Sequence, residues 1–167
     1  MQISDELNTI VAYAREEAMR TGSYDISPDH LCLAILRHSN NMACHILSSL
    51  GADLHDMKHL VEGGIMLERS IPYLQEDRVT LGYESNVTLT ESFSQAARLK
   101  SDTVCSEHLL LALSKTENTY CRAIMESYGI DFDIIDRHIP RKPKPEVKAS
   151  SLRILGTISI KAPDIYS

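Results

Sequence analysis

Two histidines of this sequence directly follow an acidic residue, and such pairs could serve acid–base or ligand-binding chemistry. The first pair, Asp29 and His30, lies in the stretch ISPDHLCLAI, residues 26–35. The second, Glu107 and His108, lies in VCSEHLLLAL, residues 104–113. An enzyme would need a nucleophile or a metal set beside each pair, and the sequence offers no candidate. We therefore expect His30 and His108 to be structural, with the ring hydrogen-bonded to a neighbouring loop at the start of the helix.

Other potential metal ligands are weaker candidates. His55 and His59 are four residues apart, so they share one face of a helix. A third ligand would have to come from His45, Asp56 or Glu62, and none has the spacing of a known motif. Four cysteines are present without a C-x-x-C pair: Cys32, Cys44, Cys105 and Cys121. We expect reduced thiols, mostly buried, and neither a metal nor a cofactor.

The two acid–histidine stretches belong to a long internal repeat. They are 78 residues apart, and this offset continues without a gap from the pair Ile26/Val104 to the pair Leu54/Phe132. Nine of these 29 aligned pairs are identical, where about two would be expected by chance. A repeat of this length predicts two similar units packed together.

Apolar residues recur at helical spacing throughout both halves, which predicts an all-α protein. The expected helices of the first half cover about 3–19, 28–36, 42–50 and 54–62. In the second half we expect helices from Thr88 or Thr90, then over 107–115, 118–128 and from 132 onwards. Side chains suited to cap helix starts precede several of them: Ser4, Ser27, Asp53, Asp131 and either Cys105 or Ser106. The apolar run Leu31 to Leu36 predicts a helix buried at the centre of its half.

Composition divides the chain into a domain and a tail. Residues 1–139 form the predicted eight-helix domain, in which two four-helix halves share one core about a pseudo-two-fold axis. The first repeat covers about 1–64, the connection 65–87, with one short extended piece, and the second repeat about 88–139. Residues 140–167 begin with a basic, proline-rich linker and continue with the β-prone stretch 152–160. That stretch could add to a sheet or to the edge of a partner, or remain a flexible tail.

Net charge and hydropathy exclude several classes of function. The chain carries 17 Lys and Arg against 23 Asp and Glu, a net charge of −6, which argues against general nucleic-acid binding. It has neither a signal peptide nor an apolar run long enough for a membrane span. Together with the cysteine usage, this favours a reducing cytoplasm.

Catalytic and nucleotide-binding motifs are also missing. The sequence contains no G-x-x-x-x-G-K-[ST] phosphate loop, no G-x-S-x-G and no H-E-x-x-H. We therefore expect no ATPase and no peptidase activity by those routes, and no enzyme activity at all.

The doubled pattern resembles the Clp N-terminal repeat, which occurs twice in ClpA-, ClpB- and ClpC-type AAA+ unfoldases. The matching features are Ala14 and Ala18, the run from Ile26 to Leu36, and L-G-A-D before Leu54. In the second half they are Ala97, Val104 to Leu113, and Tyr128 to Phe132. The resemblance covers about residues 1–139 and says nothing about 140–167. It implies an eight-helix domain that binds substrates or adaptor proteins for an AAA+ Clp unfoldase.

The resemblance also implies candidate binding residues. Some ClpC-type domains recognise phosphorylated arginine through the acid before the signature histidine and the adjoining helix N-terminus. The matching positions here are Asp29 in the first half, and Ser106 with Glu107 in the second. The first site departs from the pattern, because Pro28 removes an N–H donor and Asp29 is shorter than glutamate. The alternative is that both acids simply interact with the helix dipole.

Three hypotheses remain open. The first is a module that recognises substrates or adaptors for a Clp unfoldase. The second is a stand-alone competitor or inhibitory protein that binds Clp adaptors, and the composition of the tail favours a stand-alone chain. The third is a small enzyme or metal-binding protein that uses the acid–histidine pairs. The sequence identifies neither the specific partner nor the oligomeric state.

Overall fold

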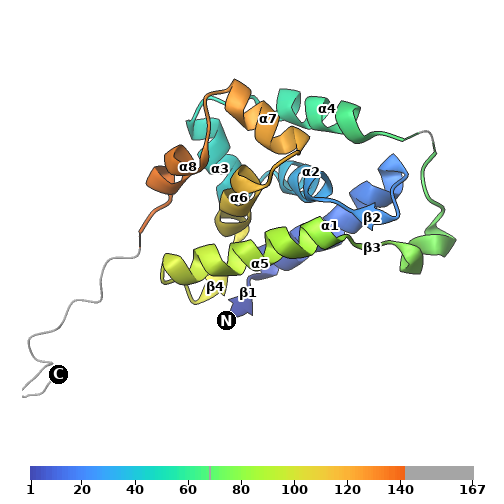
Figure 1. The fold of residues 1–167 in the computed structure, drawn as a ribbon, viewed down its shortest axis with the longest axis horizontal. Helices are drawn as coiled ribbons and strands as arrows, with labels where there is room; N and C mark the ends of the chain where they lie inside the picture. Colours follow the sequence, from blue (N-terminus) through green and yellow to red (C-terminus); the bar gives the residue numbers. More distant parts are fainter. Residues whose placement is uncertain (68, 142–167) are drawn as a thin grey trace, which may run out of the picture.

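The computed structural model describes residues 1–67 and 69–141, and these residues form an all-helical domain with short strands (Figure 1). In the first half the elements are β1 (Gln2–Ile3), α1 (Asp5–Thr21), β2 (Asp25–Ile26), α2 (Pro28–His38), α3 (Met42–Ser49) and α4 (Leu54–Ile65). A 3-10 helix η1 (Tyr73–Arg78) lies in the connection. The second half has β3 (Thr80–Leu81), α5 (Tyr83–Arg98), β4 (Thr103–Val104), α6 (Ser106–Lys115), α7 (Tyr120–Ser127) and α8 (Phe132–His138). The prediction of two four-helix halves is confirmed.

Most helices begin at a side chain that accepts a hydrogen bond from a backbone N–H of the first turn. Ser4, Ser27, Asp53 and Asp131 do so at α1, α2, α4 and α8, as predicted. At α6 the residue before the helix is Cys105 rather than Ser106. Local sequence therefore determines where most of the helices start.

The predicted start of the fifth helix was wrong. Helix α5 begins at Tyr83, well before Thr88, and Gly82 precedes it without a capping side chain. No side-chain cap marks this start, and polar residues separate it from the apolar positions that the periodicity detects. With the corrected start, α5 and α1 align at the same 78-residue offset as the signature, so the repeat extends to the beginning of each half.

Two short parallel ladders connect the halves crosswise. Strand β1 pairs with β4, so that Gln2 lies opposite Thr103, and β2 pairs with β3, so that Asp25 lies opposite Thr80. The offset of 78 converts one pairing into the other, because 2 + 78 = 80 and 25 + 78 = 103. The two halves are thus related by pseudo-two-fold symmetry, and each contributes one strand to each ladder.

The core lies between the halves and is centred on α2 and α6. Figure 1 shows these two helices in the middle of the molecule, with α4 beside α7 above them and α1 and α5 below. Residues 28–36 are all buried, which confirms the prediction of a buried second helix. Buried side chains of both halves form one continuous hydrophobic cluster. Each half therefore completes the core of the other.

The connection between the halves contacts the first half through η1. Tyr24 donates a hydrogen bond from its hydroxyl to Gln75 of η1, while Tyr73 and Leu74 of that helix are exposed. Each helix within residues 1–67 and 69–141 is too short or too polar to cross a bilayer. The β-prone stretch 152–160 of the tail lies outside the described residues.

Candidate functional site

Both signature histidines bind the backbone in front of their own helix. Nδ1 of His30 accepts a hydrogen bond from the N–H of Ser27 at 2.9 Å, and Nδ1 of His108 accepts one from the N–H of Cys105 at 2.9 Å. Both rings are 2% exposed. The histidine thus occupies the place that Glu or Gln takes in an ordinary capping box.

The surroundings of these rings keep them neutral. Burial lowers the pKa of His30 and of His108 to about 4. Because Nδ1 of His30 accepts a hydrogen bond, its proton lies on Nε2, which is 2.9 Å from the hydroxyl of Thr21. The second half has Leu99 at the position of Thr21 and therefore lacks this partner.

Asp29 caps a helix of the other half. Its two carboxylate oxygens accept hydrogen bonds from the N–H groups of Tyr120 at 3.1 Å and Cys121 at 2.8 Å, at the start of α7. The residue is 6% exposed. Burial raises the pKa of Asp29, and the two backbone hydrogen bonds oppose that rise. Both oxygens are therefore committed to a contact between the halves.

The equivalent contact in the second half is made by a different residue. Ser106, which is fully buried, accepts a hydrogen bond from the N–H of Ala43 at the start of α3 through its hydroxyl at 3.2 Å. The N–H of Ser106 in turn donates to Glu6 of α1 at 3.3 Å. Because Ser106 caps α3, Glu107 is not needed there.

Glu107 is consequently left half-buried beside a second carboxylate. Burial raises the pKa of Glu107, a hydrogen bond from its own backbone N–H opposes that rise, and the nearby charge of Glu6 adds to it. Two acids this close favour a cation between them, since a positive group would relieve both their repulsion and their desolvation. Of the three candidates Asp29, Ser106 and Glu107, only Glu107 has neither full burial nor a capping contact with the other half.

One cluster of potential metal ligands was missed by the sequence reasoning. Within the described part of the chain, the only group of three His, Cys, Asp or Glu side chains with close ligand atoms is Cys105, Glu107 and His108, whose ligand atoms lie within 4.8 Å of one another. The sequence signal for this cluster is the spacing of the three residues, which lie within four positions at the start of one predicted helix. However, Nδ1 of His108 already accepts the N–H of Cys105, so that nitrogen is not available as a metal ligand.

The residues proposed alongside His55 and His59 are not organised around those histidines. Glu62 pairs with Arg20 at 2.8 Å, and Asp56 accepts the hydroxyl of Tyr128 at 2.9 Å. Cys32, Cys44 and Cys121 are buried free thiols, as predicted. The structure thus brings together the residues at the start of α6 and leaves the α4 histidines without a described third ligand.

Comparison with known sequences identifies the family. The profile of the Clp repeat (R) N-terminal domain matches residues 2–76 and again residues 81–153. This chain belongs to the Clp N-terminal domain family. The two matches correspond to the two halves of the fold, and the resemblance seen in the doubled signature is confirmed.

Relatives of this Clp repeat chain are much longer proteins. It is 25% identical over 157 residues to an ATP-dependent Clp protease ATP-binding subunit ClpA homolog of Cyanidium caldarium, covering 90% of the chain and 16% of that protein. It is 24% identical over 134 residues to Negative regulator of genetic competence ClpC/MecB of Bacillus subtilis, covering 79% of the chain and 16% of that protein. The chain therefore spans about a sixth of these relatives.

Solved structures share the fold of this Clp domain. The N-terminal domain of Hsp104 from Candida albicans superposes with a TM-score of 0.67 at 19% identity, covering 82% of this chain and 88% of that one. The N-terminal domain of the ClpV1 ATPase from E. coli gives a TM-score of 0.66 at 16% identity, covering 81% and 82%. At these identities the likeness concerns the fold.

Proposed function

We propose that this chain is a protein-binding module that recognises substrates or adaptor proteins for a Clp-type ATP-dependent unfoldase or protease, and is itself neither an ATPase nor a peptidase. The observation that carries the proposal is the complete double Clp repeat, packed around one core. Domains of this family are non-catalytic interaction modules. Their location at one end of ATP-binding subunits suits a role in selecting what the unfoldase receives.

The acidic start of α6 supports a specific contact for such a partner. Glu107 and Glu6 together favour a guanidinium or ammonium group. A phosphoryl group on the same arginine would accept hydrogen bonds from the first-turn N–H groups of α6. One of these, the N–H of Ser106, donates to Glu6 in this structure. We therefore propose Glu107 as the main contact for an arginine or phosphoarginine side chain. Asp29 and Ser106 would support it by holding the helix starts in place.

Binding of short peptides tests this contact directly. Fluorescence anisotropy would compare a phosphoarginine peptide with the plain arginine peptide on the purified full chain. We expect binding of at least one peptide and about a tenfold loss of affinity in Glu107→Ala, because a hydrogen bond to a charged group contributes about 1.5–3 kcal/mol. The matched control is Asp77→Ala, an exposed acid of η1, which should bind as the wild type does.

If neither peptide binds, the proposed contact at the start of α6 is wrong. The binding function would then rest on docking of adaptor proteins, which a pull-down with a purified ClpC-type unfoldase and its adaptor would examine. Loss of binding in Asp77→Ala as well would indicate a general charge effect rather than a site.

The alternative role, competition for adaptors, predicts an opposite result in a degradation assay. Adding the chain to a reconstituted ClpC-dependent protease would speed the loss of a labelled substrate if the chain delivers it. It would slow that loss, and recover with added adaptor, if the chain sequesters the adaptor. The Glu107→Ala variant shows whether either effect uses the proposed contact.

A further inference from the structure

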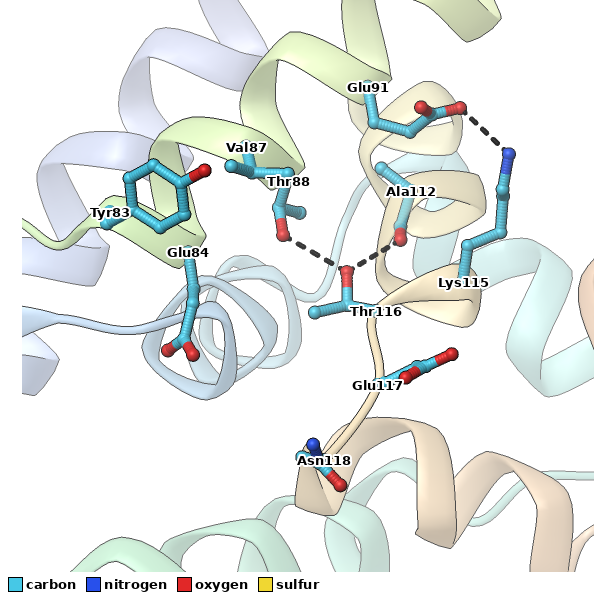
Figure 2. A pocket seen from close by; sticks show the side chains of 10 residues that line it. All are labelled: Tyr83, Glu84, Val87, Thr88, Glu91, Ala112, Lys115, Thr116, Glu117 and Asn118. Carbon is cyan, nitrogen blue, oxygen red and sulfur yellow. Dashed lines mark hydrogen bonds and ion pairs between the residues drawn. The ribbon is translucent and has the colours of Figure 1, made fainter.

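An open groove lies at the surface of the described domain. It has a volume of about 400 Å³ and is formed by the first turns of α5, the end of α6 and the loop before α7 (Figure 2). Its floor is closed by a hydrogen bond between the hydroxyls of Thr88 and Thr116 at 3.0 Å. The hydroxyl of Thr116 also donates to the carbonyl of Ala112 at 2.8 Å, so the helices that form the groove are held together.

Part of the groove wall is apolar and exposed. Tyr83 is 82% exposed and Val87 is 50% exposed, one turn apart on α5. Figure 2 shows both side chains on the α5 wall of the hollow, across from the loop that carries Glu117 and Asn118. An aromatic ring and a branched aliphatic side chain at a groove mouth are suited to hold apolar side chains of an extended peptide.

The rim of the groove is acidic. Glu91 is neutralised by Lys115 at 3.1 Å, whereas Glu84 and Glu117 are exposed and have no ion pair within the described residues. The groove continues through Glu117 and Asn118 to two further hollows along α7 and the start of α8. Together the three hollows carry six carboxylates and the two cations Lys115 and Arg122, a net charge of 2 − 6 = −4.

The remainder of this chain has the complementary composition. Residues 142–167 contain five Lys and Arg and two Asp and Glu, a net charge of 5 − 2 = +3. Residues 1–141 then carry −6 − 3 = −9. Three lysines come first, at positions 142, 144 and 148, and the apolar residues Leu152, Ile154 and Leu155 follow. A cationic segment followed by an apolar one matches an acidic channel that leads to an apolar groove.

The described residues end just after α8, the helix whose first residues line the channel. Arg141 forms an ion pair with Asp136 of α8 at 3.2 Å, and α8 contacts α6. The 26 residues that follow reach about 85 Å when extended, at about 3.3 Å per residue. A domain of this size has a radius of gyration of only about 14 Å. Length therefore does not limit where the segment binds, and charge and apolar surface select the place.

We propose that residues 142–160 of this chain dock in the groove, with the lysines along the acids of α7 and α8 and Leu152 to Leu155 against Tyr83 and Val87. The segment acts as an internal occupant of a peptide-binding surface, so that an incoming basic and apolar peptide must displace it. This inference does not depend on the contact proposed at Glu107, which lies at the other end of α6.

Zero-length cross-linking of the full chain tests the docking. A carbodiimide joins a lysine to a carboxylate only when the two are in contact, and mass spectrometry identifies the pair. We expect intrachain links from Lys142, Lys144 or Lys148 to Glu117, Glu126 or Asp133. Mixing isotopically light and heavy chains distinguishes links within one chain from links between two chains.

Variants that leave every charge in place distinguish docking in the groove from electrostatic attraction alone. Tyr83→Ser removes the apolar wall, and Leu152→Ser with Leu155→Ser removes the apolar part of the segment. Either change should lower the yield of these links about fivefold, the effect of losing about 1 kcal/mol of apolar contact. The matched control is Tyr73→Ser, because Tyr73 is 73% exposed on η1 and should have no effect.

Three outcomes overturn the proposal. Light–heavy links in the proportion expected for random pairing of chains would show that the segment binds a second copy. Links spread evenly to distant acids such as Asp77 would show that it visits the surface without a preferred place. The groove would not be the docking site if Tyr73→Ser lowered the yield of links as much as Tyr83→Ser does. The same conclusion would follow if Tyr83→Ser left the yield unchanged.

Discussion

At the scale of single residues, the acid and the histidine of each signature have separate structural tasks. Each histidine binds the backbone of its own helix start, and in the first signature the acid Asp29 binds the start of α7 in the other half. The two halves then diverge. Asp29 is a committed interhalf cap, while Ser106 takes over the corresponding role from Glu107. The duplicated motif thus uses its acid as an interhalf cap in one half only.

Substituting the two acids should separate these roles. Asp29→Ala leaves the N–H of Cys121 buried without an acceptor and removes the partner of the half-buried N–H of Tyr120. It should lower the free energy of unfolding by about 1–3 kcal/mol. Glu107→Ala is the matched control and should change it by no more than about 0.5 kcal/mol. Urea unfolding followed by circular dichroism measures both. Equal destabilisation by the two changes would contradict the asymmetry.

The buried histidines should make the domain sensitive to mild acid. Their pKa in the folded state is about 4, below the ordinary value of 6.5, so the unfolded chain binds more protons between these pH values. Stability is therefore present above pH 6.5 and is lost as the pH falls towards 4. From pH 7 to pH 5 we expect a loss of about 2 kcal/mol for each histidine.

The variant His108→Gln tests this pH effect. A glutamine at this position can accept the N–H of Cys105 but does not titrate, so the loss between pH 7 and pH 5 should shrink by about 2 kcal/mol. The raised pKa of Asp29 acts in the opposite direction, and it contributes equally to both proteins. Comparing urea unfolding of wild type and variant cancels it. An unchanged pH dependence would mean that His108 is protonated in the folded protein.

At the scale of elements, the end of α1 shows how one backbone position determines the path of the chain. Gly22 has a φ of +91°, and a Cβ there would lie 2.1 Å from the carbonyl oxygen of Arg69. Glycine is therefore required both by the left-handed backbone and by the close approach of the connection. At the equivalent position the second half has Lys100, with a φ of +57°.

Replacing glycines at two helix ends should separate strain from contact. Gly22→Ala adds a backbone clash to the left-handed strain and should cost about 2–4 kcal/mol. Gly51→Ala shares the positive φ, +94°, but has open space around its Cβ, and should cost about 1 kcal/mol. Thermal unfolding of both variants gives the comparison. Similar melting temperatures would show that the connection moves aside easily.

At the scale of the whole molecule, the two halves exchange strands and helix caps. Ladder β1–β4 and ladder β2–β3 each use one strand from each half, and Asp29 of α2 caps α7. The core is likewise one cluster. Neither half can satisfy its backbone groups or cover its apolar surface alone, so the domain should unfold in a single cooperative step.

A fragment of residues 1–79 tests this interdependence. It contains every helix of the first half but lacks β3, β4 and the partners of α2 in the second half. We expect the fragment to show weak helicity and no cooperative unfolding, measured by circular dichroism against urea. Adding the fragment 80–167 should restore the transition. A cooperative transition of the first fragment alone would contradict a shared core.

Several features followed from the sequence by itself because their causes are local. Side chains at Ser4, Ser27, Asp53 and Asp131 cap the helices that follow, and the spacing of apolar residues identifies their buried faces. The repeat, with its constant offset, predicted the pseudo-symmetry. The same local logic failed at α5, where Gly82 offers no capping side chain at Tyr83.

Only the tertiary structure decided the contacts between residues that are far apart in the chain. Asp29 and Cys121 are separated by 92 residues, and Ser106 and Ala43 by 63, so no spacing in the sequence could assign Asp29 and Ser106 to opposite helix caps. The pairing of short strands between halves was equally hidden, because two residues carry no alternation. These contacts form only when the core brings the halves together, and they determine which acid of the duplicated signature caps a helix of the other half.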